Sequence, residues 1–243
     1  MSSSTKPGRP FLTAEWRHLA MLNYAVDPRV LRDLLPAGTE LDDFRGETFV
    51  SMVGFLFLKT RLLGVPLPGY RKFEEVNLRF YVRRREPDGW RRGVVFVREI
   101  VPRVAVAAVA RIVYNEKYSA MRMRNRIEAD PPLVEYEWRH RGRWNWMIAR
   151  GDGHSAIPPD GSEESFITEH YWGYARQRDG GTVEYRVDHP QWEVMRASVA
   201  ALECDAATIY GQEFAEYLSA DPSSAFIANG SEIRVYPGRR IVI

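Results

Sequence analysis

The chain has 243 residues, and no segment between residues 20 and 240 has the composition of a linker. We therefore expect one domain over residues 13–243 after a polar, disordered tail over residues 1–12. Apolar residues make up 45% of the chain, which excludes intrinsic disorder, and a net charge of +2 does not indicate nucleic acid as a partner. With one cysteine, Cys204, and no signal peptide or membrane-spanning apolar run, the sequence predicts a cytoplasmic protein without a membrane partner.

The first half of the sequence predicts strands and two helices. Asp27 and Pro28 are a typical N-cap and first-turn pair for a short helix. Residues 87–89, Pro-Asp-Gly, indicate the turn of a hairpin. Pro102 is expected to begin the main helix, whose apolar side extends to Ile112. The expected strands are residues 19–26, 48–58, 73–83 and 90–100, and residues 62–70 are expected to form a loop.

The second half predicts two hairpins, another helix and a final strand. The hairpins are residues 133–139 with 144–149 and residues 165–174 with 182–187, the helix lies within residues 202–218, and the strand is residues 232–236. This order favours an α+β fold over a doubly wound one. Arginines cluster beside turns at residues 83–85, 91–92 and 139–143, and we expect them to be solvated ends of hairpins.

The sequence lacks the common motifs of cofactor and metal chemistry. It has no GxGxxG after a strand, no P-loop, no HExxH and no GxSxG. Its five histidines are scattered, and Cys204 has no second cysteine with which to form a zinc site. We therefore predict neither a metal nor a cofactor, although a site assembled in three dimensions stays open.

One strand, residues 73–83, carries the strongest local signal for a binding site. Apolar residues occupy alternate positions, and the other face carries four polar side chains: Glu75, Asn77, Arg79 and Tyr81. The planar fork of arginine matches a carboxylate, so this face suits an anion if it lines an interior. The alternative is that the polar face meets solvent, as in many half-solvated antiparallel sheets.

Several segments together resemble a known family. They are LLP at residues 34–36 with DDFRG at 42–46, FEEVNLRFYV at 73–82, AR at 110–111 with YNEKYSAM at 114–121, TEHY at 168–171 and HPQW at 189–192. In order and spacing they resemble the YqjF-like family of uncharacterised bacterial proteins, from about residue 15 to residue 237. That family is similar in turn to acetoacetate decarboxylase. The resemblance implies an α+β fold in which a curved antiparallel sheet forms a cone-like barrel with a pocket inside and a few packed helices.

The resemblance also implies where the chemistry of the decarboxylases would lie. In those relatives a lysine forms a Schiff base with a keto acid, an adjacent lysine lowers its pKa, and glutamates and an arginine orient the substrate. By position Arg111 matches an arginine of the relatives, Tyr118 stands at the reactive lysine, and Ser119 stands at its neighbour. Lys117 comes one residue too early, and a one-residue shift on a strand turns a side chain to the other face. We therefore predict that Schiff-base decarboxylation is absent.

Two classes of function remain open from the sequence. One is an enzyme that acts on a small carboxylate or carbonyl compound without a Schiff base, and the other is a non-catalytic ligand-binding or scaffold protein. The candidate catalytic residues are Tyr118 and Glu75, and the candidate substrate-binding residues are Arg79, Arg111, Asn77 and Tyr81. The expected partner is an anionic small molecule, and the decarboxylase relatives leave a homo-oligomer open.

Overall fold

The computed structural model describes residues 8–66, 71–102 and 117–242. The helix predicted from Pro102 to Ile112 and the candidate Arg111 therefore lie outside the described residues, except for Pro102 itself. No helix in the described part of the chain is long and apolar enough to cross a membrane.

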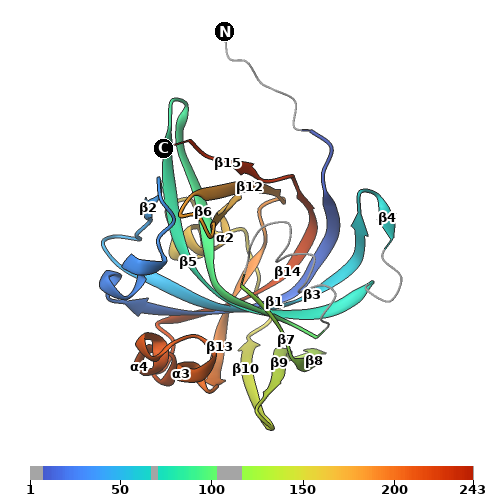
Figure 1. The fold of residues 1–243 in the computed structure, drawn as a ribbon. Helices are drawn as coiled ribbons and strands as arrows, with labels where there is room; N and C mark the ends of the chain where they lie inside the picture. The colour runs from blue at the N-terminus through green and yellow to red at the C-terminus, as the bar shows by residue number, and fades with distance from the viewer. Residues whose placement is uncertain (1–7, 67–70, 103–116, 243) are drawn as a thin grey trace.

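Strands dominate the structure, and its helices are short (Figure 1). The strands are β1 (Leu12–Val26), β2 (Glu40–Leu41), β3 (Thr48–Leu62), β4 (Val65–Pro66), β5 (Lys72–Glu86), β6 (Gly89–Val101), β7 (Tyr118–Ala120), β8 (Arg122–Ala129), β9 (Pro132–His140), β10 (Arg143–Gly151), β11 (Trp172–Arg176), β12 (Thr182–Asp188), β13 (Val194–Glu203), β14 (Ser224–Val235) and β15 (Arg239–Arg240). The helices are η1 (Pro28–Leu34), α2 (Glu163–Thr168), α3 (Ala206–Ile209), η2 (Gln212–Phe214) and α4 (Ala215–Ser219).

The strands form a curved sheet whose hydrogen bonds close into a ring. The order of paired strands is β12–β11–β6–β5–β3–β1–β14, and a direct pairing of β14 with β12 closes the ring. Most pairings are antiparallel, as predicted, but β6 pairs in parallel with both β11 and β7. Strands β13, β10, β9 and β8 continue from β14 as a meander that lies below the ring in Figure 1. The expected curved sheet is thus confirmed.

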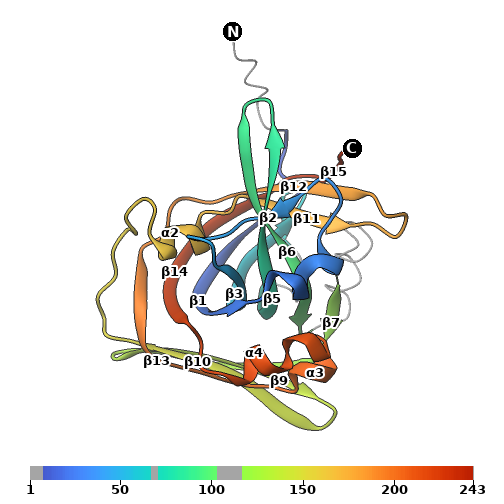
Figure 2. The same ribbon diagram turned by 90° about the vertical axis from the view of Figure 1, so that its left-hand side faces the viewer.

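The ring has an apolar cluster on each face. On one face, side chains such as Leu22 and Phe80 pack with Trp138 of the meander and with Leu218 of α4. Figure 2 shows this meander and helices α3 and α4 below the curved strands. On the other face, a second cluster gathers residues of the ring with Phe166 of α2. Since both faces of β3 are covered, its long apolar run is explained, as the sequence predicted.

Three sequence expectations need correction. Residues 202–218 do not form one helix, because β13 runs to Glu203 and Gly211, with φ of +131°, separates α3 from η2 and α4. Residues 165–174 are not a strand throughout, since α2 and a loop precede β11, although the β11–β12 hairpin is present. The final strand begins far earlier than residue 232, at Ser224.

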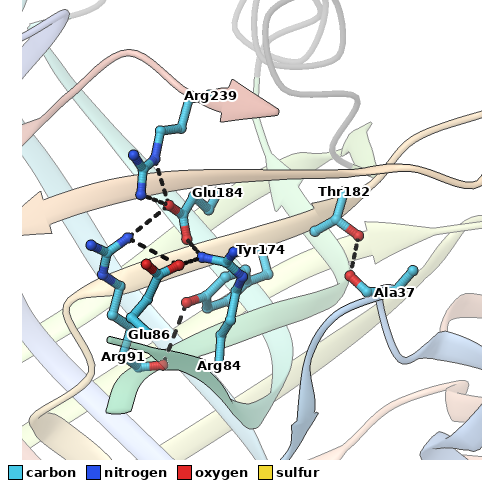
Figure 3. A network of polar contacts seen from close by, with 8 residues as sticks. All are labelled: Ala37, Arg84, Glu86, Arg91, Tyr174, Thr182, Glu184 and Arg239. Atoms are coloured by element: carbon cyan, nitrogen blue, oxygen red, sulfur yellow. Dashed lines mark hydrogen bonds and ion pairs between the residues drawn. The ribbon is translucent and has the colours of Figure 1, made fainter. Parts of the chain in front are cut away.

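The arginines near the β5–β6 turn are not simply solvated. Arg84 and Arg91 form ion pairs with Glu184 of β12, whose side chain is fully buried, and both also reach Glu86. Arg239 of β15 binds the same Glu184 carboxylate (Figure 3). The cluster thus connects the β5–β6 hairpin to β12 and to the C-terminal strand. The third arginine cluster, residues 139–143, does lie at an exposed hairpin turn, as predicted.

Candidate functional site

The polar face of β5 points into the structure. Glu75 is 3% exposed, Asn77 is 1% exposed and Tyr81 is fully buried, while Arg79 is half-buried. The alternate residues Val76 to Val82 belong to the opposite apolar cluster, so the predicted alternation is confirmed. The interpretation in which this polar face meets solvent is therefore wrong.

Glu75 is the centre of a buried hydrogen-bond network. Asn77 Nδ2 donates to Glu75 Oε1 at 3.0 Å, and the Tyr118 hydroxyl lies 3.3 Å from Glu75 Oε2. Burial raises the pKa of the Glu75 carboxyl to about 7, and these two hydrogen bonds and the charge of Arg79 offset only part of the effect. A carboxyl with such a pKa exchanges its proton near neutral pH, which suits a general acid or base.

Glu99 is a second buried carboxylate at this point, and sequence reasoning missed it. It is 2% exposed, it lies opposite Asn77 on β6, and it pairs in register with Tyr118 on β7. Regular alternation would place Glu99 on the face opposite to Phe96. A β-bulge at Val97 inserts one residue, because Leu78 pairs with Arg98 while the next residue pairs with Phe96. The bulge turns Glu99 to the interior, and no sequence pattern indicated it.

Tyr118 stands between the two carboxyl groups. Burial and the charges of Glu75 and Glu99, which also shares a hydrogen bond with this hydroxyl, raise its pKa well above the usual value. Tyr118 is therefore protonated at neutral pH. A tyrosine hydroxyl has one proton to donate, so it satisfies both carboxyl groups only when one of them is itself protonated and donates to it. With its pKa of about 7, Glu75 carries such a proton in part of the molecules at neutral pH, and where Glu75 is ionised Tyr118 is the donor.

Arg79 brings a positive charge to the polar face of β5, and not all of its N–H donors have hydrogen-bond partners among the described residues. Its Nη2 donates to the carbonyl oxygen of Ile167 at 3.2 Å, and its guanidinium lies over the ring of Tyr81. Its buried Nε has no hydrogen-bond partner among the described residues, and neither has the buried Oδ1 of Asn77. No carboxylate in the described ranges forms an ion pair with the Arg79 guanidinium. Buried polar atoms in this condition commonly mark a site that a ligand or water completes.

Tyr81 belongs to a different network, further along β5. Its hydroxyl lies 2.6 Å from Ser51 Oγ, which in turn donates to Asn23 Oδ1. The Tyr81 ring packs against His170, whose Nε2 lies 3.3 Å from Asp42 Oδ2. Burial lowers the pKa of His170 to about 4, so its ring is neutral at neutral pH. The structure therefore brings Glu75, Asn77 and Tyr118 together, with Arg79 beside them, whereas the Tyr81 hydroxyl is already engaged.

A model of the DUF2071 family, described as an uncharacterized conserved protein, matches residues 13–232. The chain belongs to the DUF2071 family. YqjF of Bacillus subtilis (strain 168) is 38% identical over 68 residues, which are 28% of this chain and 28% of that protein. The chain thus matches well under half the length of this curated relative, and the match shows kinship rather than a shared activity.

Solved structures share the fold of this DUF2071 chain at low identity. Acetoacetate decarboxylase from Legionella pneumophila has a TM-score of 0.67 and 14% identity, covering 97% of this chain and 88% of that chain. The enduracididine biosynthesis enzyme MppR, complexed with pyruvate, has a TM-score of 0.68 and 14% identity, covering 98% and 93%. An acetoacetate decarboxylase-like enzyme from Sphingomonas wittichii RW1 has a TM-score of 0.66 and 12% identity, covering 100% and 98%. Likeness at this level establishes the fold alone.

The described lysines of the DUF2071 chain are exposed. Lysine occurs only at positions 6, 59, 72 and 117. Lys59, Lys72 and Lys117 are exposed, and Lys6 lies outside the described residues. Lys117 precedes Tyr118 directly, and it is the tyrosine whose side chain reaches Glu75. Nor do three or more His, Cys, Asp or Glu side chains gather as a metal site in the part of the chain that the structure describes.

Proposed function

We propose that this DUF2071 protein binds and transforms a small carboxylate or carbonyl compound on the interior face of β5. The observation that carries the proposal is the buried network of Glu75, Asn77 and Tyr118, with the guanidinium of Arg79 beside it. A fold neighbour that is complexed with pyruvate supports a keto acid or related anion as the ligand.

Each group has a distinct part in the proposed chemistry. Arg79 holds the ligand carboxylate through the Nε–H that has no partner among the described residues. Asn77 keeps one oxygen of Glu75 in place through its Nδ2–H donor. Glu75 takes up or releases a proton at the carbon or oxygen next to the carbonyl, and Tyr118 donates a hydrogen bond to the oxygen on which negative charge develops. Arg111 remains a further candidate for the anion, outside the described residues.

The proposed reaction uses no Schiff base. An imine-forming lysine needs a lowered pKa, which burial or a neighbouring cation provides, and the described lysines are exposed. Borohydride treatment with acetoacetate or pyruvate, followed by mass spectrometry of peptides, is therefore expected to give no reduced lysine adduct. A stoichiometric adduct at Lys117 would overturn this part of the proposal.

The alternative is a protein that binds the same ligand without transforming it. The tyrosine at the position of the reactive lysine favours this alternative, since a tyrosine cannot form a Schiff base. The raised pKa of Glu75 favours an enzyme, because binding alone does not require a group that titrates near neutrality. The substitution Tyr118→Phe distinguishes the two, because it removes the hydroxyl and keeps the ring.

The first experiment is a thermal-shift screen of small monocarboxylates, dicarboxylates and keto acids. A ligand at a hundred times its Kd adds about 2.7 kcal/mol of stability, which is readily measured as a rise in Tm. We expect the rise to disappear in Arg79→Gln and to persist in Arg122→Gln, which removes an exposed arginine on β8. Persistence of the rise in Arg79→Gln would refute the proposed role of Arg79.

The same ligands then decide between enzyme and binding protein. Turnover that is lost in Tyr118→Phe and Glu75→Gln, while the thermal shift remains, supports catalysis. A ligand that binds through Arg79 and is returned unchanged by the wild-type protein supports the non-catalytic alternative.

A further inference from the structure

One region of the surface is hollowed where β1 begins and where β3, β12 and β14 end. A cavity of about 870 Å³ opens there, within the size range of sites for small molecules. Five basic and three acidic residues line it: Arg17, Lys59, Arg61, Arg71 and Arg234, with Glu15, Asp188 and Glu232. Glu75, Arg79 and Tyr118 are not among the described residues that line it.

Local ion pairs neutralise only part of this charge. Glu15 pairs with both Arg17 and Lys59, and Asp188 pairs with Arg186, which lies outside the cavity. Arg61, Arg71 and Arg234 form no ion pair with any described residue. The cavity therefore contains three arginines whose charge is not balanced by a direct partner, against the single carboxylate of Glu232.

The strand register aligns two of these arginines. Thr13 on β1 pairs with Arg61 on β3 on one side and with Arg234 on β14 on the other. Directly opposed residues of neighbouring strands point to the same face of the sheet, with Cα atoms about 5 Å apart. Arg61 and Arg234 thus flank the Thr13 side chain on one face, about 10 Å apart at Cα, close enough for two long side chains to hold one anion.

The donors at this place are arginines. Thr60 also lines the cavity, but it is 2% exposed with a buried Oγ1, whereas the next residue on the strand, Arg61, is exposed, so the hydroxyl faces away from the arginines. Two arginines aligned across three strands, and a third at residue 71 directly before β5, provide donors of the kind that bind phosphate.

We propose that this cavity binds the phosphate group of a small phosphorylated molecule. Arg61 and Arg234 hold the phosphate oxygens over Thr13, and Arg71 adds a third positive charge from the segment that precedes β5. The proposal does not depend on the function proposed for the interior network, since the two sites share no residue.

Pyrophosphate is the probe for the test, measured by isothermal titration calorimetry at low ionic strength. Wild-type protein is expected to bind it with an affinity that falls as salt is added. Loss of one charge-assisted contact corresponds to about a tenfold weaker Kd, so Arg234→Gln should weaken binding about tenfold and the double variant Arg61→Gln/Arg234→Gln should abolish it. Arg122→Gln, which removes the same charge at an exposed position outside the cavity, is the matched control.

Two further measurements test the position and the chemistry of the phosphate site. Arg79→Gln should leave pyrophosphate binding unchanged, so failure of the interior site and failure of this site give different results. Citrate, a polycarboxylate, should bind more weakly than pyrophosphate if the cavity is built for phosphate. Equal binding of pyrophosphate by wild type and by a folded double variant would overturn the proposal, as would absence of binding at millimolar concentration or preference for citrate.

Discussion

The substitution Glu75→Gln tests the electrostatics of the interior network directly. The Glu75 carboxyl has a pKa of about 7 in the folded protein against 4.5 in its ordinary environment. Because the folded state holds this proton more tightly, neutral Glu75 contributes stability that is fully present below pH 4.5 and is lost as the pH rises through about 7. One pKa unit corresponds to about 1.4 kcal/mol, so the loss at high pH is about 3 kcal/mol.

Glutamine has nearly the shape of a protonated glutamate and cannot ionise. The difference in free energy of unfolding, Glu75→Gln minus wild type, should therefore increase with pH, by about 3 kcal/mol between acid and alkaline conditions. Urea unfolding at several pH values, from about 4.5 to about 8.5, measures this difference. Glu128→Gln, which removes the same charge at an exposed position on β8, should not show such a gain. A difference between wild type and Glu75→Gln that stays constant over this range would refute the reasoning.

Four further substitutions test the packing and the charges of the fold. Glu184→Gln should destabilise the protein by about 3 kcal/mol in urea unfolding, because it removes the fully buried carboxylate that pairs with the partly buried Arg84 and Arg91. Arg239→Gln, at a side chain 60% exposed, should cost under about 1 kcal/mol. Gly93→Ala should cost at least about 1–3 kcal/mol, because its Cβ would lie 2.5 Å from the Trp172 carbonyl oxygen where β6 meets β11. His170 has a pKa of about 4 in the folded protein against 6.5 ordinarily, so the folded state loses stability relative to the unfolded state as the pH falls from 6.5 through about 4. Glutamine does not titrate in this range, so the stability of His170→Gln should fall less than that of the wild type in an acid titration.

The sequence predicted the strand that carries the interior site because polar and apolar side chains alternate along residues 75–82. Alternation of this kind follows from the geometry of a strand alone. In the structure the polar and the apolar side chains accordingly lie on opposite faces of β5, and both faces are largely buried. The sequence did not reveal that the polar face is buried, since alternation is the same for an interior and for a solvated face. The resemblance to the decarboxylase fold supplied that inference and pointed to Tyr118.

Features that depend on distant pairings were not predictable. Glu99 reaches the interior through a bulge at Val97, and a bulge has no reliable pattern in a single sequence. The arginines beside the β5–β6 turn looked solvated because Glu184, far away in the sequence, is brought to them only by the β11–β12 hairpin. For the same reason, the alignment of Arg61 with Arg234 exists only in the register of three strands.

The interior charges also determine how pH should act on a ligand in the proposed site. An anion held by Arg79 would add negative charge near Glu75, and a nearby negative charge favours the protonated form of a carboxyl. Ligand binding would then raise the pKa of Glu75 further and take up a proton near neutral pH. By linkage, the affinity of such an anion should increase as the pH falls through about 7, opposite to the behaviour of a site whose carboxylate must stay ionised. The proton gained on binding is the one that Glu75 would deliver to the ligand, so the electrostatics that favour the anion also prepare the acid.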